Sequence, residues 1–91
     1  MKHWLSTMEV PIKRDWAPAY KLRKASLASD QIRRSLDLAE ESISVDPSHR
    51  DQRFELNGVV IDTNEPGMMV AFRIEPDGTI MFLTFTDLWN R

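Results

Sequence analysis

Residues Met68 to Thr86 read MMVAFRIEPDGTIMFLTFT, and this stretch decides the fold. Two alternating, largely apolar segments flank the four residues from Glu75 to Gly78, which read Glu-Pro-Asp-Gly. Proline presets φ at the second position of a tight turn, and glycine takes the left-handed conformation that closes it. The stretch therefore predicts an antiparallel hairpin with a type I turn and a glycine bulge, in which Glu75 lies opposite Thr79.

Counting outward from this turn assigns each side chain to one of two faces, because successive residues of a strand point to opposite sides. The first face is predicted to be a core beneath helices, with the pairs Ile74 and Ile80, Phe72 and Phe82, and Val70 and Thr84. The second face is predicted to hold the pairs Arg73 and Met81, Ala71 and Leu83, and Met69 and Phe85. This second face is apolar apart from one cation, so we expect something to cover it.

The N-terminal part predicts an edge strand and a first helix. Met8 to Arg14 contains a short alternation around Pro11, which cannot donate to a strand ladder. Asp15 is a suitable N-cap and Pro18 fits a first helical turn, so a helix is expected from Trp16 to Leu27. Its buried face is predicted to consist of Trp16, Tyr20 and Leu27.

A second helix is expected to begin after a cap at Ser29 or Asp30 and to end near Val45, shortly before Pro47. Apolar residues recur in it at steps of four, three and four, which is the spacing of one buried stripe. These residues are Ile32, Leu36, Ala39 and Ile43.

The remaining segment predicts extended structure. Arg53 to Leu56 begins it, Asn57-Gly58 is a turn signal, and Val59 to Thr63 is a short strand that leads into the hairpin. The predicted order is strand, two helices and three strands, β-α-α-β-β-β. We therefore expect a single α+β domain over residues 1–91, with two helices packed on one face of a small antiparallel sheet.

Composition excludes several kinds of site. The 91 residues contain no cysteine, so neither a disulfide nor a thiolate metal site is available. His3 and His49 are isolated from other ligands, no glycine loop fits a phosphate, and no serine or carboxylate has a partner at catalytic spacing. We expect no cofactor and no metal. The absence of an apolar run of about 18 residues and of a secretion signal predicts a cytoplasmic protein without a membrane partner.

Positive charge gathers between Lys13 and Arg34, where seven Lys and Arg side chains stand against Asp15 and Asp30. Such a basic segment can bind nucleic acid, although a solvated helix surface has the same composition. The nucleic-acid-binding candidates are Lys21, Arg23, Lys24, Arg33 and Arg34.

The second face of the hairpin supplies the other candidates. Arg73 could hold a phosphate of RNA, with Arg53 and Arg91 as possible neighbours. It could instead form a salt bridge with Glu55, Glu75 or Asp87. The apolar residues of the face predict a partner-binding surface, unless the chain's own ends cover it. These partner-binding candidates are Met69, Met81, Leu83 and Phe85.

The hairpin resembles the RelE/ParE superfamily of bacterial toxins, whose members have a hydrophobic strand with an arginine, an acidic turn with glycine and a second hydrophobic strand. The matching residues are Phe72-Arg73-Ile74, the turn from Glu75 to Gly78, and Ile80 to Leu83. The resemblance implies a RelE/ParE-like fold neutralised by an antitoxin. RelE-like members cut mRNA at the ribosome and ParE-like members poison DNA gyrase. If the chain is a metal-independent ribonuclease, its catalytic candidates are Arg73, Arg91 and Arg53.

Two functional hypotheses follow. The first is a toxin-like component of a bacterial toxin–antitoxin pair, acting on translation by mRNA cleavage or on DNA gyrase, with RNA, the ribosome or gyrase as its target. The second is a non-catalytic interaction module that keeps the fold and binds an antitoxin-like protein or a second copy through the sheet face. Val59 to Thr63 and Thr86 to Asn90 lack the basic residues of RNA-cutting members, which favours the second hypothesis.

Overall fold

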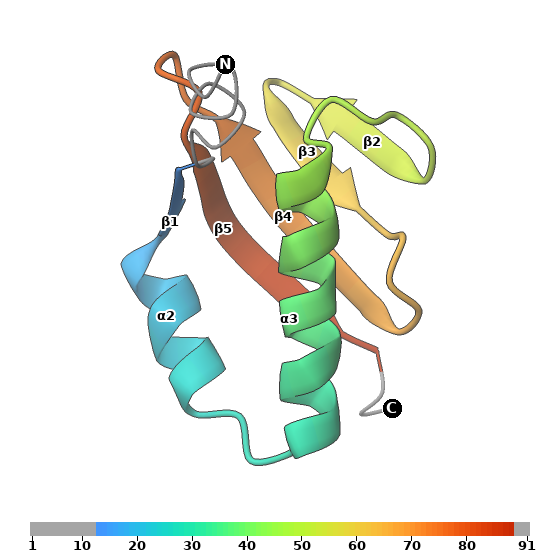
Figure 1. Ribbon diagram of the computed structural model, residues 1–91. Helices are drawn as coiled ribbons and strands as arrows, with labels where there is room; N and C mark the ends of the chain where they lie inside the picture. Colours follow the sequence, from blue (N-terminus) through green and yellow to red (C-terminus); the bar gives the residue numbers. More distant parts are fainter. Residues whose placement is uncertain (1–12, 89–91) are drawn as a thin grey trace, which may run out of the picture.

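The computed structural model describes residues 13–88, and in them two helices pack on one face of a five-stranded sheet (Figure 1). The elements in chain order are β1 (Arg14–Trp16), α2 (Pro18–Ala25), α3 (Asp30–Val45), β2 (Arg53–Leu56), β3 (Val59–Asp62), β4 (Met68–Ile74) and β5 (Ile80–Asp87). The strand order across the sheet is β1-β5-β4-β3-β2. The predicted α+β class with helices on one face is confirmed.

The sheet differs from the prediction in two respects. It is mixed rather than antiparallel, because β1 runs parallel to β5 while the other neighbouring strands are antiparallel. It also contains β2 as a full strand, paired with β3 across the two-residue turn Asn57-Gly58. Both turn residues have positive φ, 53° and 82°, as a type I′ hairpin turn requires.

The turn of the β4–β5 hairpin forms as predicted. The Glu75 amide donates to the Thr79 carbonyl at 2.8 Å, and the Gly78 amide donates to the Glu75 carbonyl at 2.8 Å. Gly78 has a φ of 91°, so the glycine bulge of the prediction is present. The pairs Ile74 with Ile80 and Phe72 with Phe82 are also confirmed.

Beyond Phe72 the predicted register is wrong, because the β4–β5 ladder contains an irregularity between Ala71 and Phe72. Ala71 pairs with Thr84 rather than Leu83, and Val70 pairs with Phe85 rather than Thr84. One extra residue in β5 moves every following side chain to the other face. Phe85 therefore lies in the core.

The first helix begins later than predicted. Trp16 belongs to β1, and the amide of Ala17 donates to the Phe82 carbonyl at 2.9 Å, which continues the pairing with β5. Ala17 is the N-cap, extended at φ −60° and ψ 147°, because a residue before proline disfavours the helical conformation. Asp15 does not cap the helix; its side chain accepts from the Trp16 amide. Most of the predicted strand, from Met8 to Ile12, lies outside the described residues.

The second helix matches its prediction at both ends. The Ser29 hydroxyl caps it by accepting from the Ile32 amide at 3.2 Å, and the helix ends at Val45. Leu36, Ala39 and Ile43 are buried on one side.

The core lies between this stripe and the covered face of the sheet. The helices contribute Tyr20, Leu36, Ala39 and Ile43 to it, and the sheet contributes Val60, Met68, Val70, Phe72, Ile80, Phe82 and Phe85. Tyr20 packs against the rings of Phe82 and Phe85, with centroid distances of 5.9 Å and 5.0 Å. Ile74 was predicted to belong to this core, but it is 44% exposed because it lies at the end of β4, next to the turn.

Candidate functional site

The sheet face opposite the helices, called here the open face, is largely apolar. Strand pairing places its side chains in rows: Phe54 lies beside Ile61 and Ile61 beside Ala71, Leu56 lies beside Val59, and Arg73 lies beside Met81. Its apolar members are Phe54, Leu56, Val59, Ile61, Met69, Ala71, Met81 and Leu83.

Exposure on the open face is uneven. Met69, Met81 and Leu83 are half-buried, whereas Phe54 and Leu56 on the edge strand β2 are 64% and 71% exposed. Three of the four predicted partner-binding residues therefore lie on this face. The placement of Phe85 there is wrong, because the register shift buries its ring against Tyr20 and Val70. Large exposed apolar surface of this kind is typical of an interface.

Arg73 is a cation on the open face. Its guanidinium Nε donates to the Glu75 carboxylate at 2.8 Å, so the salt bridge considered as an alternative at the sequence level is present. About half of the Arg73 side chain remains exposed, at 49%. An exposed ion pair of this kind contributes little to stability, so a phosphate could compete for the arginine.

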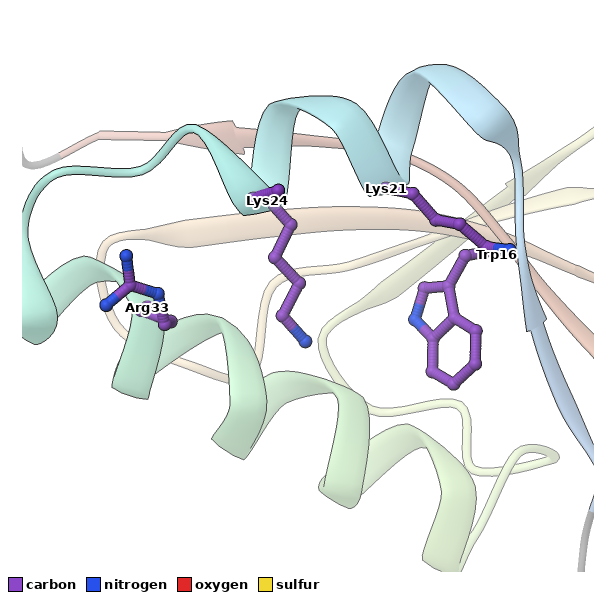
Figure 2. Close-up of a pocket in the computed structure, with 5 residues that line it drawn as sticks. Trp16, Lys21, Lys24 and Arg33 are labelled. Atoms are coloured by element: carbon purple, nitrogen blue, oxygen red, sulfur yellow. The ribbon is translucent and has the colours of Figure 1, made fainter.

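The five basic helix residues separate into different surroundings. Lys21, Lys24 and Arg33 line one groove of about 440 Å³ together with Trp16 and Ala25, called here the α2–α3 groove. Figure 2 shows the Trp16 ring and the Lys24 side chain directed into the space between α2 and α3. Arg23 faces elsewhere, with its guanidinium 4.1 Å from the centre of the Phe85 ring and donating to the Phe85 carbonyl. Arg34 is exposed.

Lys24 belongs to a partly buried polar network between the two helices. Its ammonium lies 2.8 Å from Asp37 and 3.1 Å from Glu40, and the Tyr20 hydroxyl donates to Glu40 at 2.7 Å. Burial, followed by the hydrogen bond to Glu40, raises the pKa of Tyr20 far above its usual value of 10.0. Although burial opposes it, the hydrogen bonds to Asp37 and Glu40 raise the pKa of Lys24. This network joins α2 to α3.

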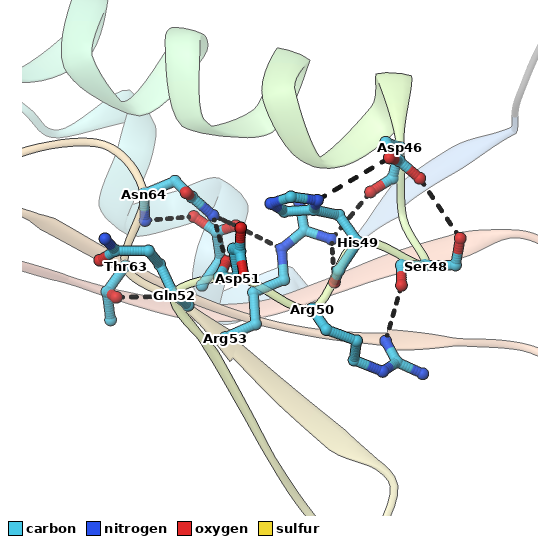
Figure 3. A network of polar contacts seen from close by, with 10 residues as sticks. Asp46, Ser48, His49, Arg50, Asp51, Gln52, Arg53, Thr63 and Asn64 are labelled. Atoms are coloured by element: carbon cyan, nitrogen blue, oxygen red, sulfur yellow. Dashed lines mark hydrogen bonds and ion pairs between the residues drawn. The ribbon is translucent and has the colours of Figure 1, made fainter.

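Arg53, predicted as a neighbour of Arg73, is instead held inside the domain (Figure 3). Its Nε donates to the Asp62 carboxylate at 2.6 Å, and both side chains are 1% exposed. The same guanidinium donates to the carbonyls of Asp46 and His49 at 2.8 Å and 3.1 Å, so it joins the end of α3 to the sheet. Arg53 points to the helix side of the sheet, and a catalytic role for it is not supported. Arg91 lies outside the described residues.

Known proteins resemble this chain in structure rather than in sequence. No family model and no curated protein sequence matches it. The RelE–RelB complex of the archaeon Pyrococcus horikoshii matches with a TM-score of 0.65 at 12% identity, over 90% of this chain and 100% of that chain. The isolated E. coli RelE toxin matches with a TM-score of 0.67 at 8% identity, over 84% of this chain and 83% of that chain. The RelBE2 toxin–antitoxin complex of Mycobacterium tuberculosis matches with a TM-score of 0.66 at 14% identity, over 86% of this chain and 99% of that chain.

The fold is RelE-like. The architecture inferred from the hairpin motif is therefore confirmed by three solved structures that cover 84–90% of the chain. At identities of 8–14% the similarity concerns the backbone arrangement, and the side chains of the open face have to be interpreted from this chain alone.

Two residues of the open face were missed at the sequence level, Phe54 and Leu56. The signal was present in Asn57-Gly58, because a two-residue turn places Leu56 opposite Val59 and Phe54 opposite Ile61. Val60 and Asp62 are buried, so Val59 and Ile61 lie on the open face, and their partners Leu56 and Phe54 in β2 lie on the same face.

Residues 13–88 contain neither a metal site nor a membrane-spanning helix. No three His, Cys, Asp or Glu side chains there lie close enough together to hold a metal ion. None of the helices in this part of the chain has the length and apolar character needed to cross a membrane.

Proposed function

We propose that this protein is the toxin-like component of a bacterial toxin–antitoxin pair and that it acts on translation. The observation that carries the proposal is the match of its fold to three RelE toxin structures over 83–100% of their chains. Two of those structures are complexes, one with RelB and one described as toxin–antitoxin. An antitoxin that covers the exposed apolar residues of the open face would hold the toxin inactive.

Arg73 is the proposed contact to RNA on this face. Its guanidinium is half-exposed, and its present partner Glu75 is bound only through an exposed ion pair. A phosphate of mRNA offers a charge-assisted hydrogen bond of the same kind and can compete with that carboxylate for the guanidinium. In a cleavage reaction the guanidinium would stabilise the charge that develops on the phosphate, with Arg91 as a second proposed cation.

Induced expression in E. coli tests this proposal. The wild-type chain should arrest growth, and a purified translation extract should show cleaved mRNA and lost peptide synthesis. Arg73→Ala should relieve both effects without loss of folding, whereas Arg50→Ala, which removes an exposed arginine from the α3–β2 loop, should leave both unchanged. Normal growth with abundant soluble protein would refute a toxin role. Growth arrest with intact translation and lost DNA supercoiling would identify gyrase as the target instead.

A second function is favoured by the burial of Arg53 and the exposure of Phe54 and Leu56. In this alternative the chain is a non-catalytic module that binds an antitoxin-like protein or a second copy of itself through the open face. The double change Phe54→Asp and Leu56→Asp should abolish binding to whichever of these two partners the chain has. The circular dichroism spectrum should stay unchanged, because both side chains lie outside the core. Unaltered binding by this variant would exclude the open face as the interface.

A further inference from the structure

The ion pair of Arg73 and Glu75 leaves part of the guanidinium free for a ligand. Both side chains lie on the open face, because residues two apart in a strand point to the same side. The Arg73 Nε donates to Oε2 of Glu75 at 2.8 Å, and the two terminal nitrogens have no partner among residues 13–88. A phosphate can therefore bind the terminal nitrogens while Glu75 stays on Nε.

The second carboxylate oxygen of Glu75 is also free. Oε1 accepts no hydrogen bond within residues 13–88, and it is not one of the buried side-chain atoms there that lack a partner. The Glu75 side chain is 27% exposed, so a substrate can reach this oxygen from the solvent. A carboxylate that is held by one oxygen and free at the other can take a proton from a hydroxyl group beside the bound phosphate.

A hollow of about 380 Å³ adjoins this pair on the open face. Met81, the strand partner of Arg73, gives it an apolar wall. The charged side chains that residues 13–88 contribute to the hollow are all carboxylates, so a second phosphate is disfavoured there. A nucleoside is neutral and offers amino and hydroxyl donors to such acceptors. The lining residues are Asp15, Glu75, Pro76, Asp77, Thr79 and Met81.

The other two carboxylates of the hollow do not contact the arginine. Asp77 accepts from the amide of Thr79 at 2.9 Å, and Asp15 accepts from the amide of the residue that follows it at 2.8 Å. Within the described part of the chain, neither forms an ion pair with Arg73. Glu75 is therefore the carboxylate placed beside the nitrogens that would hold a phosphate.

We propose that Glu75 is the general base of RNA cleavage at Arg73, an inference that rests on the proposed function. Oε1 of Glu75 takes the proton of a ribose 2′-hydroxyl, the 2′-oxygen attacks the adjacent phosphorus, and the bond from phosphorus to the 5′-oxygen breaks. The leaving 5′-oxygen takes a proton from water, and Glu75 returns its proton to the hydroxide so formed. The products carry a 2′,3′-cyclic phosphate and a 5′-hydroxyl. Arg73 stabilises the charge that develops on the phosphate, and the nucleoside with the 2′-hydroxyl occupies the hollow.

Cleavage of labelled mRNA in the purified translation extract tests the proposal. Glu75→Gln should cleave at least about 100-fold more slowly, because general-base catalysis contributes that much. The same variant should still compete with the wild type for the mRNA at unchanged affinity, whereas Arg73→Ala should lose both cleavage and competition. Glu75→Asp keeps a carboxylate and should restore part of the rate. An mRNA with a 2′-deoxynucleotide at the cut site should resist cleavage.

Glu41→Gln is the matched control. Glu41 is an exposed carboxylate of α3 that lies 3.8 Å from Arg14, so its replacement also removes an exposed ion pair. This variant should cleave at the wild-type rate. Loss of an exposed pair costs little stability, so Glu75→Gln should keep the circular dichroism spectrum of the folded chain.

Three results would overturn the assignment of Glu75 and leave the proposed function standing. The first is cleavage by Glu75→Gln at the wild-type rate, and the second is cleavage at a 2′-deoxynucleotide, which has no hydroxyl to activate. The third is a Glu75→Gln variant that no longer competes for mRNA, which would assign Glu75 to RNA binding instead. Intact mRNA in the presence of the folded wild-type chain would refute the proposed cleavage activity itself, and this inference with it.

Discussion

Replacing Asp62 by asparagine is expected to destabilise the domain by about 3 kcal/mol, because it leaves the Arg53 charge buried without a counter-ion. The two side chains are 1% exposed and their atoms Nε and Oδ2 lie 2.6 Å apart. Breaking a buried ion pair from one side costs about 3–5 kcal/mol. The lower end of that range applies here, because asparagine keeps one oxygen and Arg53 retains the carbonyls of Asp46 and His49.

Urea unfolding followed by circular dichroism measures this effect. A domain of this size has a free energy of unfolding of roughly 5–14 kcal/mol, so the variant should lose a large fraction of it. With a urea slope of about 1.5 kcal/mol per M, the midpoint should fall by about 2 M. Glu75→Gln is the matched control, because it removes an ion pair with a 2.8 Å separation that is exposed. This control should lose less than about 1 kcal/mol.

A double replacement separates the pair's own contribution from the penalty of an unpaired charge. Arg53→Met with Asp62→Leu removes both charges and keeps apolar volume, so it should be close to neutral in stability. The reasoning fails if Asp62→Asn and Glu75→Gln have the same small effect, because Arg53 would then be solvated or compensated in some other way. It also fails if the double variant is less stable than Asp62→Asn.

Further expectations concern the core, the turn and the helix network. In urea unfolding, Phe85→Ala should lower the free energy of unfolding by about 3–5 kcal/mol and Leu83→Ala by clearly less, because the Phe85 side chain is fully buried and that of Leu83 is only half-buried. Equal losses would contradict the observed register. Gly78→Ala should cost about 1 kcal/mol or more, since φ is 91° there, and an unchanged melting midpoint would speak against the glycine bulge. Above pH 10 the free energy of unfolding should fall, because Tyr20 ionises in the unfolded chain while its raised pKa keeps it neutral in the fold. The raised pKa of Lys24 acts in the same direction. Tyr20→Phe should make this fall with pH shallower, and an identical pH slope would contradict the buried hydrogen bond from Tyr20 to Glu40.

Several elements could be predicted because their causes are local. The β4–β5 turn depends on four consecutive residues, and α3 depends on a Ser29 cap and an apolar stripe at helical spacing. The pair Arg53 and Asp62 was also within reach, since the Asn57-Gly58 turn places them opposite each other. The start of α2 was missed although the effect of Pro18 on Ala17 is local as well.

The sequence by itself determined the turns, the length of α3 and the apolar alternation that gives an α+β domain. Only the tertiary structure decided which side of the sheet Phe85 occupies and that β1 runs parallel to β5. The physical reason is that a bulge and a parallel pairing depend on packing between segments distant in sequence, and not on local residue preferences. A register shift of one residue in β5 placed Phe85 in the core, although it was predicted on the open face.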